Sequence, residues 1–272
     1  MLPVSLRDLL ARTSQPPHTV VVIPARYDSS RLPGKVLADI GGEPMIVHVY
    51  RRAAATRGVD AVIVATDNER VVQAVEAVGG IACLTRTDHR TGTDRVAEIA
   101  EALDCEIVVN LQGDEPLIHP EMIRATIEPL SRDASLEMST VCRAITDPDD
   151  YMNPNVVKVV RDSRGMALYF SRSPIPHVRG PRPTLWKHFG LYGYRKPFLL
   201  KFTRLAPTPL EQAESLEQLR ALEHGYRIFT ATTEHDSIGV DTPEDLDRAR
   251  RLMSSRARLD AEPVGPGDRA HI

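Results

Sequence analysis

Cysteine is scarce in this chain, and long apolar runs are absent. Only Cys83, Cys105 and Cys142 occur among 272 residues. Their odd number and wide spacing fit neither a disulfide framework nor a zinc site, so we expect a protein of the reducing cytoplasm. The longest apolar runs, such as residues 20–25, hold six residues, whereas a membrane span needs about 20. The first 18 residues also lack the continuous apolar stretch of a secretory signal.

An excess of either charge is also missing. The 34 lysines and arginines nearly balance the 37 aspartates and glutamates, which gives a formal net charge of −3. A globally basic nucleic-acid binder is therefore disfavoured, although a local basic patch is compatible with this balance. With 42% hydrophobic and 26% charged residues, the composition is typical of a soluble globular protein of one large or two small domains.

In the first half of the chain, apolar runs alternate with helical patterns. Runs that are apolar at every position predict buried strands at residues 19–23, 61–65 and 107–111, with a short strand at 81–84. Apolar residues at helical spacing predict helices at 45–55, 69–78 and 92–103. We therefore predict an α/β layered fold, a doubly wound and mostly parallel sheet covered on both faces.

The second half of the chain has a different pattern. Strand-like pieces at 156–160, 167–170 and 189–194 lie among proline-rich loops. Two helices follow, one over residues 210–223 and one that Thr242, Pro243 and Asp245 begin as a variant capping box. We interpret residues 1–18 as an N-terminal extension, 19–253 as a single domain and 254–272 as a flexible tail.

The loop after the first predicted strand concentrates positive charge. It contains Arg26, Ser29, Arg31 and Lys35 but lacks the glycines of a Walker loop or of a dinucleotide-binding turn. Ligands bind beyond the carboxyl ends of strands in open α/β sheets, so these cations suit a triphosphate and a leaving pyrophosphate. The alternative is a solvated basic loop.

Two aspartates are candidates for a metal site. Asp114 follows Gly113 directly after the strand at 107–111, where a carboxylate suits Mg²⁺. Asp241 precedes a helix that Thr242 can cap, which leaves its carboxylate for another task. Alternatively, Asp114 is a turn residue and Asp241 is the cap itself. Their spacing does not show that they meet.

The segment 86–94 is a further candidate at a strand end. Small hydroxyl residues and Gly92 could press the backbone against a base or ribose there. Local signals favour a plainer interpretation, in which Thr91 or Thr93 caps the following helix.

Other polar candidates lie in the second half. Arg172, His188 and Tyr192 lie among aromatic residues, where a lone histidine is more often structural than catalytic. Glu217 and Gln218 lie off the apolar stripe of their helix, where a solvated face is the default interpretation.

Eight motifs occur in one order along the chain. They are V-I-P-A-R-Y-x-S-x-R-L-P-G-K, T-G-T-D-R, N-L-Q-G-D-E-P, N-P-N-V-V-K-V-V, A-L-Y-F-S-R, K-H-F-G-L-Y-G-Y-R, L-E-Q-L-R and G-V-D-T-P-E-D-L. In this combination, over about residues 20–253, the chain resembles the 3-deoxy-manno-octulosonate cytidylyltransferase (CMP-KDO synthetase) family. Val36 replaces the usual proline and Asp94 the commoner glutamate, and neither change removes a charge that the reaction needs.

The resemblance implies a nucleotidyltransferase fold of the glycosyltransferase-A-like type, with a smaller inserted subregion at about 145–200 that forms a homodimer. It implies transfer of CMP from CTP to the anomeric hydroxyl of 3-deoxy-manno-octulosonate (KDO) for lipopolysaccharide biosynthesis. The family mechanism is an in-line attack on the α-phosphorus, assisted by Mg²⁺, with pyrophosphate leaving. No covalent protein nucleophile is needed, so the cysteines are interpreted as structural.

The resemblance also assigns site residues by position. The phosphates would be held by Arg26, Ser29, Arg31 and Lys35. The cytidine side would be lined by Arg86, Gly92, Thr93 and Gln112. The sugar pocket would contain Gln112, Arg172, His188, Tyr192, Glu217 and Gln218, with Arg172 and His188 as donors to the sugar carboxylate. Asp114 and Asp241 would ligate Mg²⁺, and together with Arg26, Arg31 and Lys35 they form the predicted catalytic set.

Three other functions remain open from the sequence. A related synthetase could act on sialic acid or on an 8-amino relative of KDO, since one changed pocket residue could shift the sugar. A catalytically silent nucleotide-binding regulator is a second possibility, but it would not need both Asp114 and Asp241. A nucleic-acid binder using the loop 26–35 is disfavoured because Tyr27 is its only stacking platform.

Overall fold

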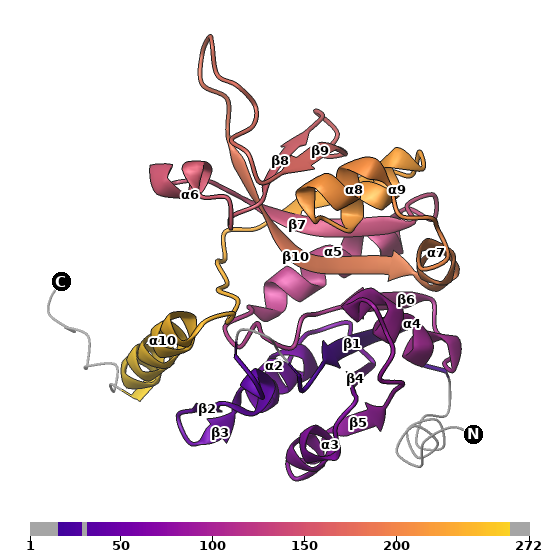
Figure 1. Ribbon diagram of the computed structural model, residues 1–272, viewed down its shortest axis with the longest axis vertical. Helices are drawn as coiled ribbons and strands as arrows, with labels where there is room; N and C mark the ends of the chain where they lie inside the picture. The colour runs from indigo at the N-terminus through magenta and orange to yellow at the C-terminus, as the bar shows by residue number, and fades with distance from the viewer. Residues whose placement is uncertain (1–15, 29–31, 262–272) are drawn as a thin grey trace, which may run out of the picture.

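The computed structural model describes residues 16–28 and 32–261, with side chains as far as residue 255. Within these residues, nine strands form one mixed sheet (Figure 1). They are β1 (Thr19–Ala25), β4 (Ala61–Thr66), β5 (Ile81–Leu84), β6 (Ile107–Asn110), β7 (Met138–Ala144), β8 (Lys158–Arg161), β9 (Ala167–Ser171), β10 (Trp186–Arg195) and β11 (Ile228–Thr232). The order is β11-β7-β10-β6-β1-β4-β5, and β8 joins β9 to β10.

The strands predicted in the first half are confirmed, and they form the parallel half of the sheet. β1 pairs in parallel with both β4 and β6, and β4 pairs with β5. Successive β1 residues face opposite cores, with Val20 and Val22 on one face and Val21 and Ile23 on the other. All four are buried because helices cover both faces, as a run apolar at every position predicts.

β1 ends later than the predicted residue 23. It continues through Pro24, which is in register with Ala65 of β4. The Val22 carbonyl points towards β6, and the backbone nitrogen of Pro24, two residues later, lies on the same edge of β1. Pro24 comes after Val22, the last β1 residue that is paired with β6. No ladder hydrogen bond is needed from Pro24 there, and the missing N–H is tolerated.

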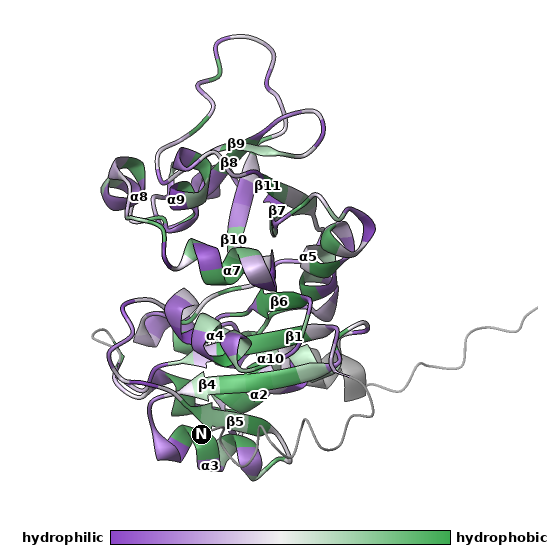
Figure 2. Ribbon diagram, turned by 90° about the vertical axis from the view of Figure 1, so that its right-hand side faces the viewer, coloured by the Kyte–Doolittle hydropathy of each residue, from purple (hydrophilic) through white to green (hydrophobic). Residues whose placement is uncertain are grey.

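Helices cover the two faces of the sheet. One face carries α2 (Met45–Ala54), α3 (Glu69–Glu76) and α5 (Pro120–Arg132). The other carries α4 (Gly92–Glu101), α7 (Lys196–Phe202) and α9 (Gln218–Glu223). Figure 2 shows that β1 and β4 are largely hydrophobic. The prediction of an α/β layered sheet is therefore confirmed, with helices at 45–55, 69–78 and 92–103 shortened by one or two residues at their ends.

The second half of the sheet is antiparallel at its centre. β10 lies between β6 and β7 and is antiparallel to both, while β11 is parallel to β7. The strands predicted at 156–160, 167–170 and 189–194 are confirmed as β8, β9 and the larger part of β10, whereas sequence patterns missed β7, β11, α5 and α7. Most of the segment 145–200 projects as the short helix α6 (Pro148–Met152), the β8–β9 hairpin and a long loop, whereas β10 runs back into the sheet (Figure 1).

The predicted single helix over residues 210–223 is wrong. The structure has α8 (Pro209–Glu214) and α9, separated at Ser215, which adopts a left-handed backbone with φ 51°. Arg172 donates to the carbonyl oxygens of Glu214 and Ser215 and so holds this turn from another part of the chain. The apolar stripe continues across the break, which is why periodicity alone does not reveal it.

A crossing segment returns the chain to the first half. After β11, residues 233–242 lead to α10 (Pro243–Ala261), which lies beside the β2–β3 hairpin (Asp39–Ile40 and Glu43–Pro44) (Figure 1). Val240, Leu246 and Ala249 pack there against Ile40 and Met45.

Helix α10 also bears on the predicted tail. Since it reaches Ala261, the first part of the segment 254–272 is helical. Residues 262–272, and 1–15 of the predicted extension, lie outside the described residues. No helix in the described part of the chain has the length and apolarity needed to span a bilayer.

Candidate active site

Lys35 joins the two candidate metal-binding aspartates. Its Nζ lies 2.6 Å from Asp114 Oδ2 and 2.9 Å from Asp241 Oδ1, and it donates to the Val240 carbonyl at 3.1 Å. The side chain of Lys35 is only 12% exposed. Burial by itself lowers the pKa of Lys35, but the charges and hydrogen bonds of Asp114 and Asp241 outweigh it and raise the pKa above its usual value. The crossing segment thus brings together residues whose spacing left their meeting open.

Asp241 is not the cap of α10. The Thr242 hydroxyl accepts from the Asp245 amide at 3.2 Å, and Asp245 Oδ2 accepts from the Thr242 amide at 3.0 Å. This reciprocal pair is the capping box that the sequence predicts. The alternative in which Asp241 caps the helix is therefore wrong, and its carboxylate serves the contact with Lys35.

A cavity of about 290 Å³ surrounds these three residues at the carboxyl ends of β1 and β6. Its lining includes six of the predicted site residues: Arg26, Lys35, Gly92, Gln112, Asp114 and Asp241. Gly113 allows a close approach here, because a Cβ on it would lie 3.0 Å from the Pro24 carbonyl oxygen. The expectation that ligand groups follow the strand ends agrees with this geometry.

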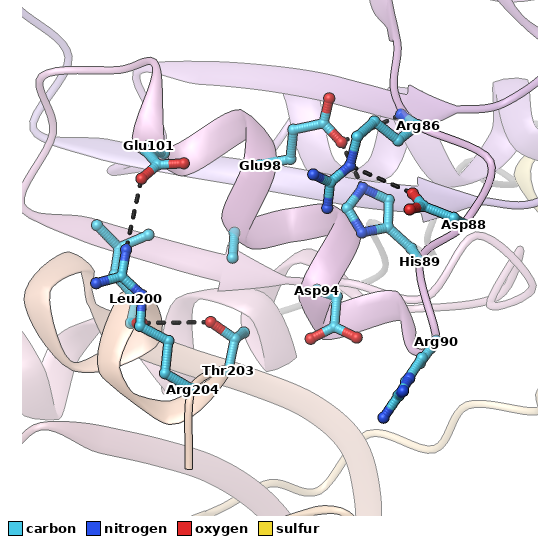
Figure 3. A pocket seen from close by; sticks show the side chains of 11 residues that line it. Arg86, Asp88, His89, Arg90, Asp94, Glu98, Glu101, Leu200, Thr203 and Arg204 are labelled. Atoms are coloured by element: carbon cyan, nitrogen blue, oxygen red, sulfur yellow. Dashed lines mark hydrogen bonds and ion pairs between the residues drawn. The ribbon is translucent and has the colours of Figure 1, made fainter. Parts of the chain in front are cut away.

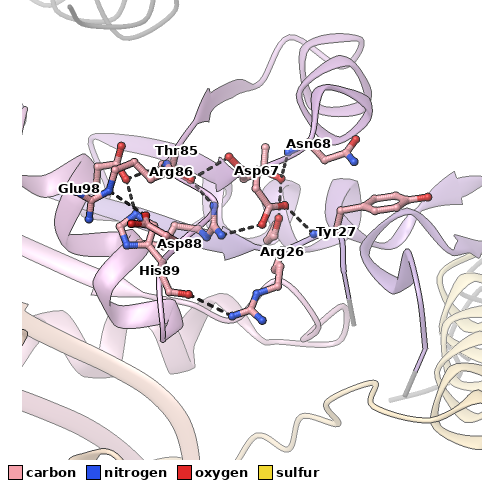
Figure 4. A network of polar contacts seen from close by, with 12 residues as sticks. Arg26, Tyr27, Asp67, Asn68, Thr85, Arg86, Asp88, His89 and Glu98 are labelled. Atoms are coloured by element: carbon pink, nitrogen blue, oxygen red, sulfur yellow. Dashed lines mark hydrogen bonds and ion pairs between the residues drawn. The ribbon is translucent and has the colours of Figure 1, made fainter. Parts of the chain in front are cut away.

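Arg95 is a cavity residue that sequence reasoning missed. Its guanidinium is 2% exposed, lines the same cavity, and donates to Asp67 at 2.8 Å and to Thr85. Asp67 in turn accepts from the Tyr27 amide at 3.0 Å, so a buried ion pair anchors the start of the basic loop (Figure 4). The sequence did carry a signal for this residue. Arg95 ends the T-G-T-D-R motif and is a charged residue on the core-facing side of α4.

Thr91 and Thr93 have separate tasks. Thr91 caps α4 in a capping box with Asp94. Thr93 is buried, and its hydroxyl donates to Glu217 Oε2 at 2.5 Å while accepting from Asn110 Nδ2 at 3.2 Å. The Thr93 side chain therefore meets a predicted sugar-pocket residue rather than the lining of the Lys35 cavity.

Besides Thr93, three predicted phosphate or cytidine residues are not placed at the Lys35 cavity. Arg86 lines a neighbouring cavity of about 350 Å³ and pairs with Asp88 at 3.3 Å (Figure 3). Ser29 and Arg31 lie outside the described residues. The roles assigned to all three by resemblance stay predictions.

His188 and Tyr192 cluster on the face of the sheet that carries α9. Their ring centroids are 5.5 Å apart, and the imidazole meets Phe170 edge-on. Burial lowers the pKa of His188 to about 3, so the ring is neutral near pH 7. Burial also raises the pKa of the Tyr192 phenol, and the charge of Glu217 adds to this effect.

The hydrogen bonds of Thr140 decide which nitrogen of His188 carries the proton. Thr140 donates to the Leu191 carbonyl at 2.8 Å, so its oxygen accepts from His188 Nε2 at 2.9 Å. The imidazole then has Nδ1 left as an acceptor. His188 is thus suited to accept from a sugar hydroxyl, in contrast to the expected donation to a carboxylate.

Glu217 and Gln218 begin α9 and face inward. Burial raises the pKa of Glu217, and the hydrogen bond from Thr93 opposes this shift. Glu217 Oε1 and Gln218 Nε2 are buried without a hydrogen-bond partner among the described residues. Buried polar atoms are rarely left unpaired without a reason, and a ligand is a common one. The default interpretation of a solvated helix face is therefore wrong for these two residues.

Arg172 is committed to main-chain oxygens. Its guanidinium donates to the carbonyls of Pro154, Glu214 and Ser215, and its amide donates to the Glu214 carboxylate at 2.9 Å. These contacts shape the turn that leads into Glu217. Its predicted role as a donor to the sugar carboxylate stays a prediction.

Two kinds of sequence comparison relate this chain to known proteins. The family model described as Cytidylyltransferase matches residues 20–228. A 3-deoxy-manno-octulosonate cytidylyltransferase of Geobacter metallireducens is 54% identical over 86% of this chain and 96% of its own length. A protein of the same name from Solibacter usitatus is 51% identical over 86% of this chain and 94% of its own.

Two solved structures are similar to this fold. A CMP:2-keto-3-deoxy-manno-octonic acid synthetase complexed with CTP superposes with a TM-score of 0.85 and 47% identity, covering 88% of this chain and 99% of the other. A 4-diphosphocytidyl-2C-methyl-D-erythritol synthase from Anaerococcus prevotii, 16% identical with a TM-score of 0.60 over 87% and 98% of the two chains, shares the fold.

Proposed function

This chain belongs to the 3-deoxy-manno-octulosonate cytidylyltransferase family, and on that basis we propose that it transfers CMP from CTP to the anomeric hydroxyl of KDO, releasing pyrophosphate. The observation that carries the proposal is the meeting of Lys35, Asp114 and Asp241 in one cavity at the strand ends. A polyanionic nucleotide needs cations there, and a metal that accompanies it needs carboxylates.

The basic side chains of the cavity act on the phosphates. Arg26 and Lys35 line the cavity, and Ser29 and Arg31 belong to the same loop. Negative charge grows on the leaving pyrophosphate as the bond to the α-phosphorus breaks. Cations held in place before the reaction stabilise that charge without reorganising, which lowers the barrier.

The donor set of Asp114 and Asp241 fits Mg²⁺. Both offer carboxylate oxygens, which this ion prefers, and both lie close enough together to contact the single ammonium group of Lys35. Among the described residues there is no group of three or more His, Cys, Asp or Glu side chains suited to a metal. Substrate phosphates would therefore complete the coordination. Bound there, Mg²⁺ would neutralise phosphate charge and make the attacking hydroxyl more acidic.

An asparagine at position 241 tests this assignment. Asp241→Asn keeps the size of the side chain, and Thr242 still caps α10, so the variant should fold and bind CTP. Most turnover should be lost, and raised Mg²⁺ or Mn²⁺ should restore part of it. A folded variant with wild-type kcat at limiting Mg²⁺ would remove Asp241 from the site.

The sugar side, formed by His188, Tyr192, Glu217 and Gln218, offers both donors and acceptors for hydrogen bonds. Gln218 Nε2 can donate to a hydroxyl, and Glu217 Oε1 and His188 Nδ1 can accept from one. Tyr192 lies beside His188. Gln112 lines the nucleotide cavity and donates to Asn110, the residue in register with Tyr192. The sugar carboxylate would turn towards Arg172 or the cations of the nucleotide side.

We further propose a cytoplasmic homodimer that serves lipopolysaccharide biosynthesis. The scarcity of cysteine supports a reducing compartment. Met152 and Leu168, in the projecting segment 145–200, are 67% and 63% exposed and supply apolar surface for a dimer contact. Sedimentation of the wild type and of Leu168→Lys would test the contact. The lysine places a charge in the apolar surface, so it should shift the equilibrium from dimer to monomer.

Pyrophosphate release is the direct test of the reaction. We expect release from CTP with KDO, and far lower kcat/KM with ATP or GTP. A panel with sialic acid and the 8-amino relative of KDO distinguishes related sugar specificities. CTP binding with no release for any sugar would favour the silent regulator instead.

A further inference from the structure

Four polar side chains form a hydrogen-bonded chain between the two halves of the site. Thr93 Oγ1 donates to Glu217 Oε2 at 2.5 Å, Asn110 Nδ2 donates to Thr93 Oγ1 at 3.2 Å, and Gln112 Nε2 donates to Asn110 Oδ1 at 3.1 Å. Asn110 and Thr93, in the middle, are 1% and 3% exposed. Glu217 belongs to the sugar side, and Gln112 lines the nucleotide cavity.

The carboxylate at one end sets the direction of every bond. An ionised Glu217 has no hydrogen to give, so Thr93 must donate its single hydroxyl hydrogen to it. The Thr93 oxygen then accepts from the Asn110 amide nitrogen. This orientation turns the carbonyl oxygen of Asn110 towards Gln112, which has to donate through Nε2.

The remaining oxygen of Gln112, Oε1, lies beside Gly92 at the cavity. A Cβ on Gly92 would lie 3.6 Å from Gln112 Oε1 and 3.3 Å from Pro24 Cγ. Both Gly92 and Gln112 line the Lys35 cavity. The absent side chain of Gly92 therefore leaves room beside a hydrogen-bond acceptor whose orientation is fixed from behind.

We propose that Asn110 is a positioning residue that, together with Thr93, holds the Gln112 amide so that Oε1 accepts a hydrogen bond from an amino or hydroxyl group of the bound nucleotide. The inference rests on the proposed function, because it assigns the nucleotide to this cavity. Asn110 itself is not among the residues that line the cavity. Without these hydrogen bonds, the Gln112 amide can rotate and present its nitrogen, rather than its oxygen, to the nucleotide.

A matched pair of substitutions at Thr93 tests the proposal. Thr93→Val removes the hydroxyl at nearly constant volume, whereas Thr93→Ser keeps it. We expect the Kd for CTP, measured by calorimetry with Mg²⁺ and without sugar, to rise about tenfold in Thr93→Val and to stay within about twofold in Thr93→Ser. If Thr93→Ser keeps the CTP affinity that Thr93→Val loses, the loss comes from the missing hydrogen bond and not from changed packing.

A double-mutant cycle shows whether the effect passes through Gln112. In a Gln112→Leu background, Thr93→Val should cause no further loss of CTP affinity, because the positioned group is already absent. Asn110→Leu should behave like Thr93→Val in both backgrounds. Thermal unfolding of each variant establishes that it is folded, and the Thr93 pair decides the outcome if Asn110→Leu does not fold.

The outcomes separate the two proposals. A folded Thr93→Val with wild-type CTP affinity, or an equal further loss in the Gln112→Leu background, overturns the positioning role. If the wild type releases no pyrophosphate from CTP and KDO while the CTP affinities follow the expected pattern, the proposed reaction is wrong and the positioning role stands. A wild type that does not bind CTP overturns both.

Discussion

The nucleotide side and the sugar side of the site use opposite electrostatics. On the nucleotide side, Lys35, Asp114 and Asp241 are charged, partly exposed and paired with one another. On the sugar side, His188 is neutral, and the Glu217 carboxylate is buried with an oxygen that has no hydrogen-bond partner in the described part of the chain. The charged groups of the first arrangement contact one another before any ligand arrives, whereas the second arrangement leaves polar atoms that a ligand would have to satisfy.

This difference indicates how each half contributes. Paired charges can be exchanged for phosphates and a metal with little desolvation, so the nucleotide side can bind a highly charged ligand and stabilise its transition state. Buried polar atoms without partners reject a ligand that cannot satisfy them, so the sugar side is suited to selection. Substitutions should therefore affect mainly kcat on the nucleotide side and mainly the KM of the sugar on the sugar side.

The largest effect is expected at Asp114. Asp114→Asn removes a negative charge next to Lys35, and we expect kcat to fall by about 100- to 1,000-fold. Asp247→Asn is the matched control, because Asp247 pairs only with Arg250 on the exposed surface of α10 among the described contacts. Steady-state pyrophosphate release measures both variants. A kcat within about tenfold of the wild type would contradict a metal-binding role for Asp114.

Lys35→Met should separate metal binding from turnover. Removing the ammonium should lower kcat by about 100-fold, because the growing charge on pyrophosphate loses a cation. Without the positive charge between them, the two carboxylates should attract Mg²⁺ more strongly and lower the Mg²⁺ concentration needed for half-maximal CTP binding. A variant that only raises the KM for CTP would mean that Lys35 binds ground state and transition state equally.

Glu217→Gln should act on the other substrate. The amide keeps an oxygen that accepts from Thr93 but removes the charge that faces the sugar, so we expect the KM for KDO to rise about tenfold. The calorimetric Kd for CTP should stay within about twofold, since the hydrogen-bonded chain to Gln112 is preserved. A matched loss of CTP affinity would show that the two halves are not separable at this residue.

The smallest effect is a pH-dependent change in stability from the same substitution. The pKa of Glu217 is raised above its usual value of 4.5, so the folded state favours the protonated form. Stability from this group is present below about pH 4.5 and is lost as pH rises through the folded pKa. Glu217→Gln should therefore melt like the wild type at acid pH and at a higher temperature than the wild type at pH 8. A lower melting temperature at pH 8 would contradict the sign of this shift.

Local sequence patterns were sufficient to predict those features of the fold that depend on residues close together in the chain. Runs that are apolar at every position predicted the parallel strands, because a strand that is covered on both faces has no polar side. Thr242, Pro243 and Asp245 gave the start of α10 because a capping box is closed within one turn. The basic loop and Gly113 were placed at the site because strand ends collect ligand groups in this architecture.

The sequence by itself determined the layered fold of the first half and which residue types stand at its strand ends. Only the tertiary structure decided that Asp241 reaches Lys35, that α8 and α9 separate at Ser215, and that Thr93 bonds Glu217. Each of these features depends on segments that lie far apart in the chain. Their contacts are set by how helices and strands pack, since hydrophobic periodicity shows which face of an element is buried but not which distant side chain that face meets.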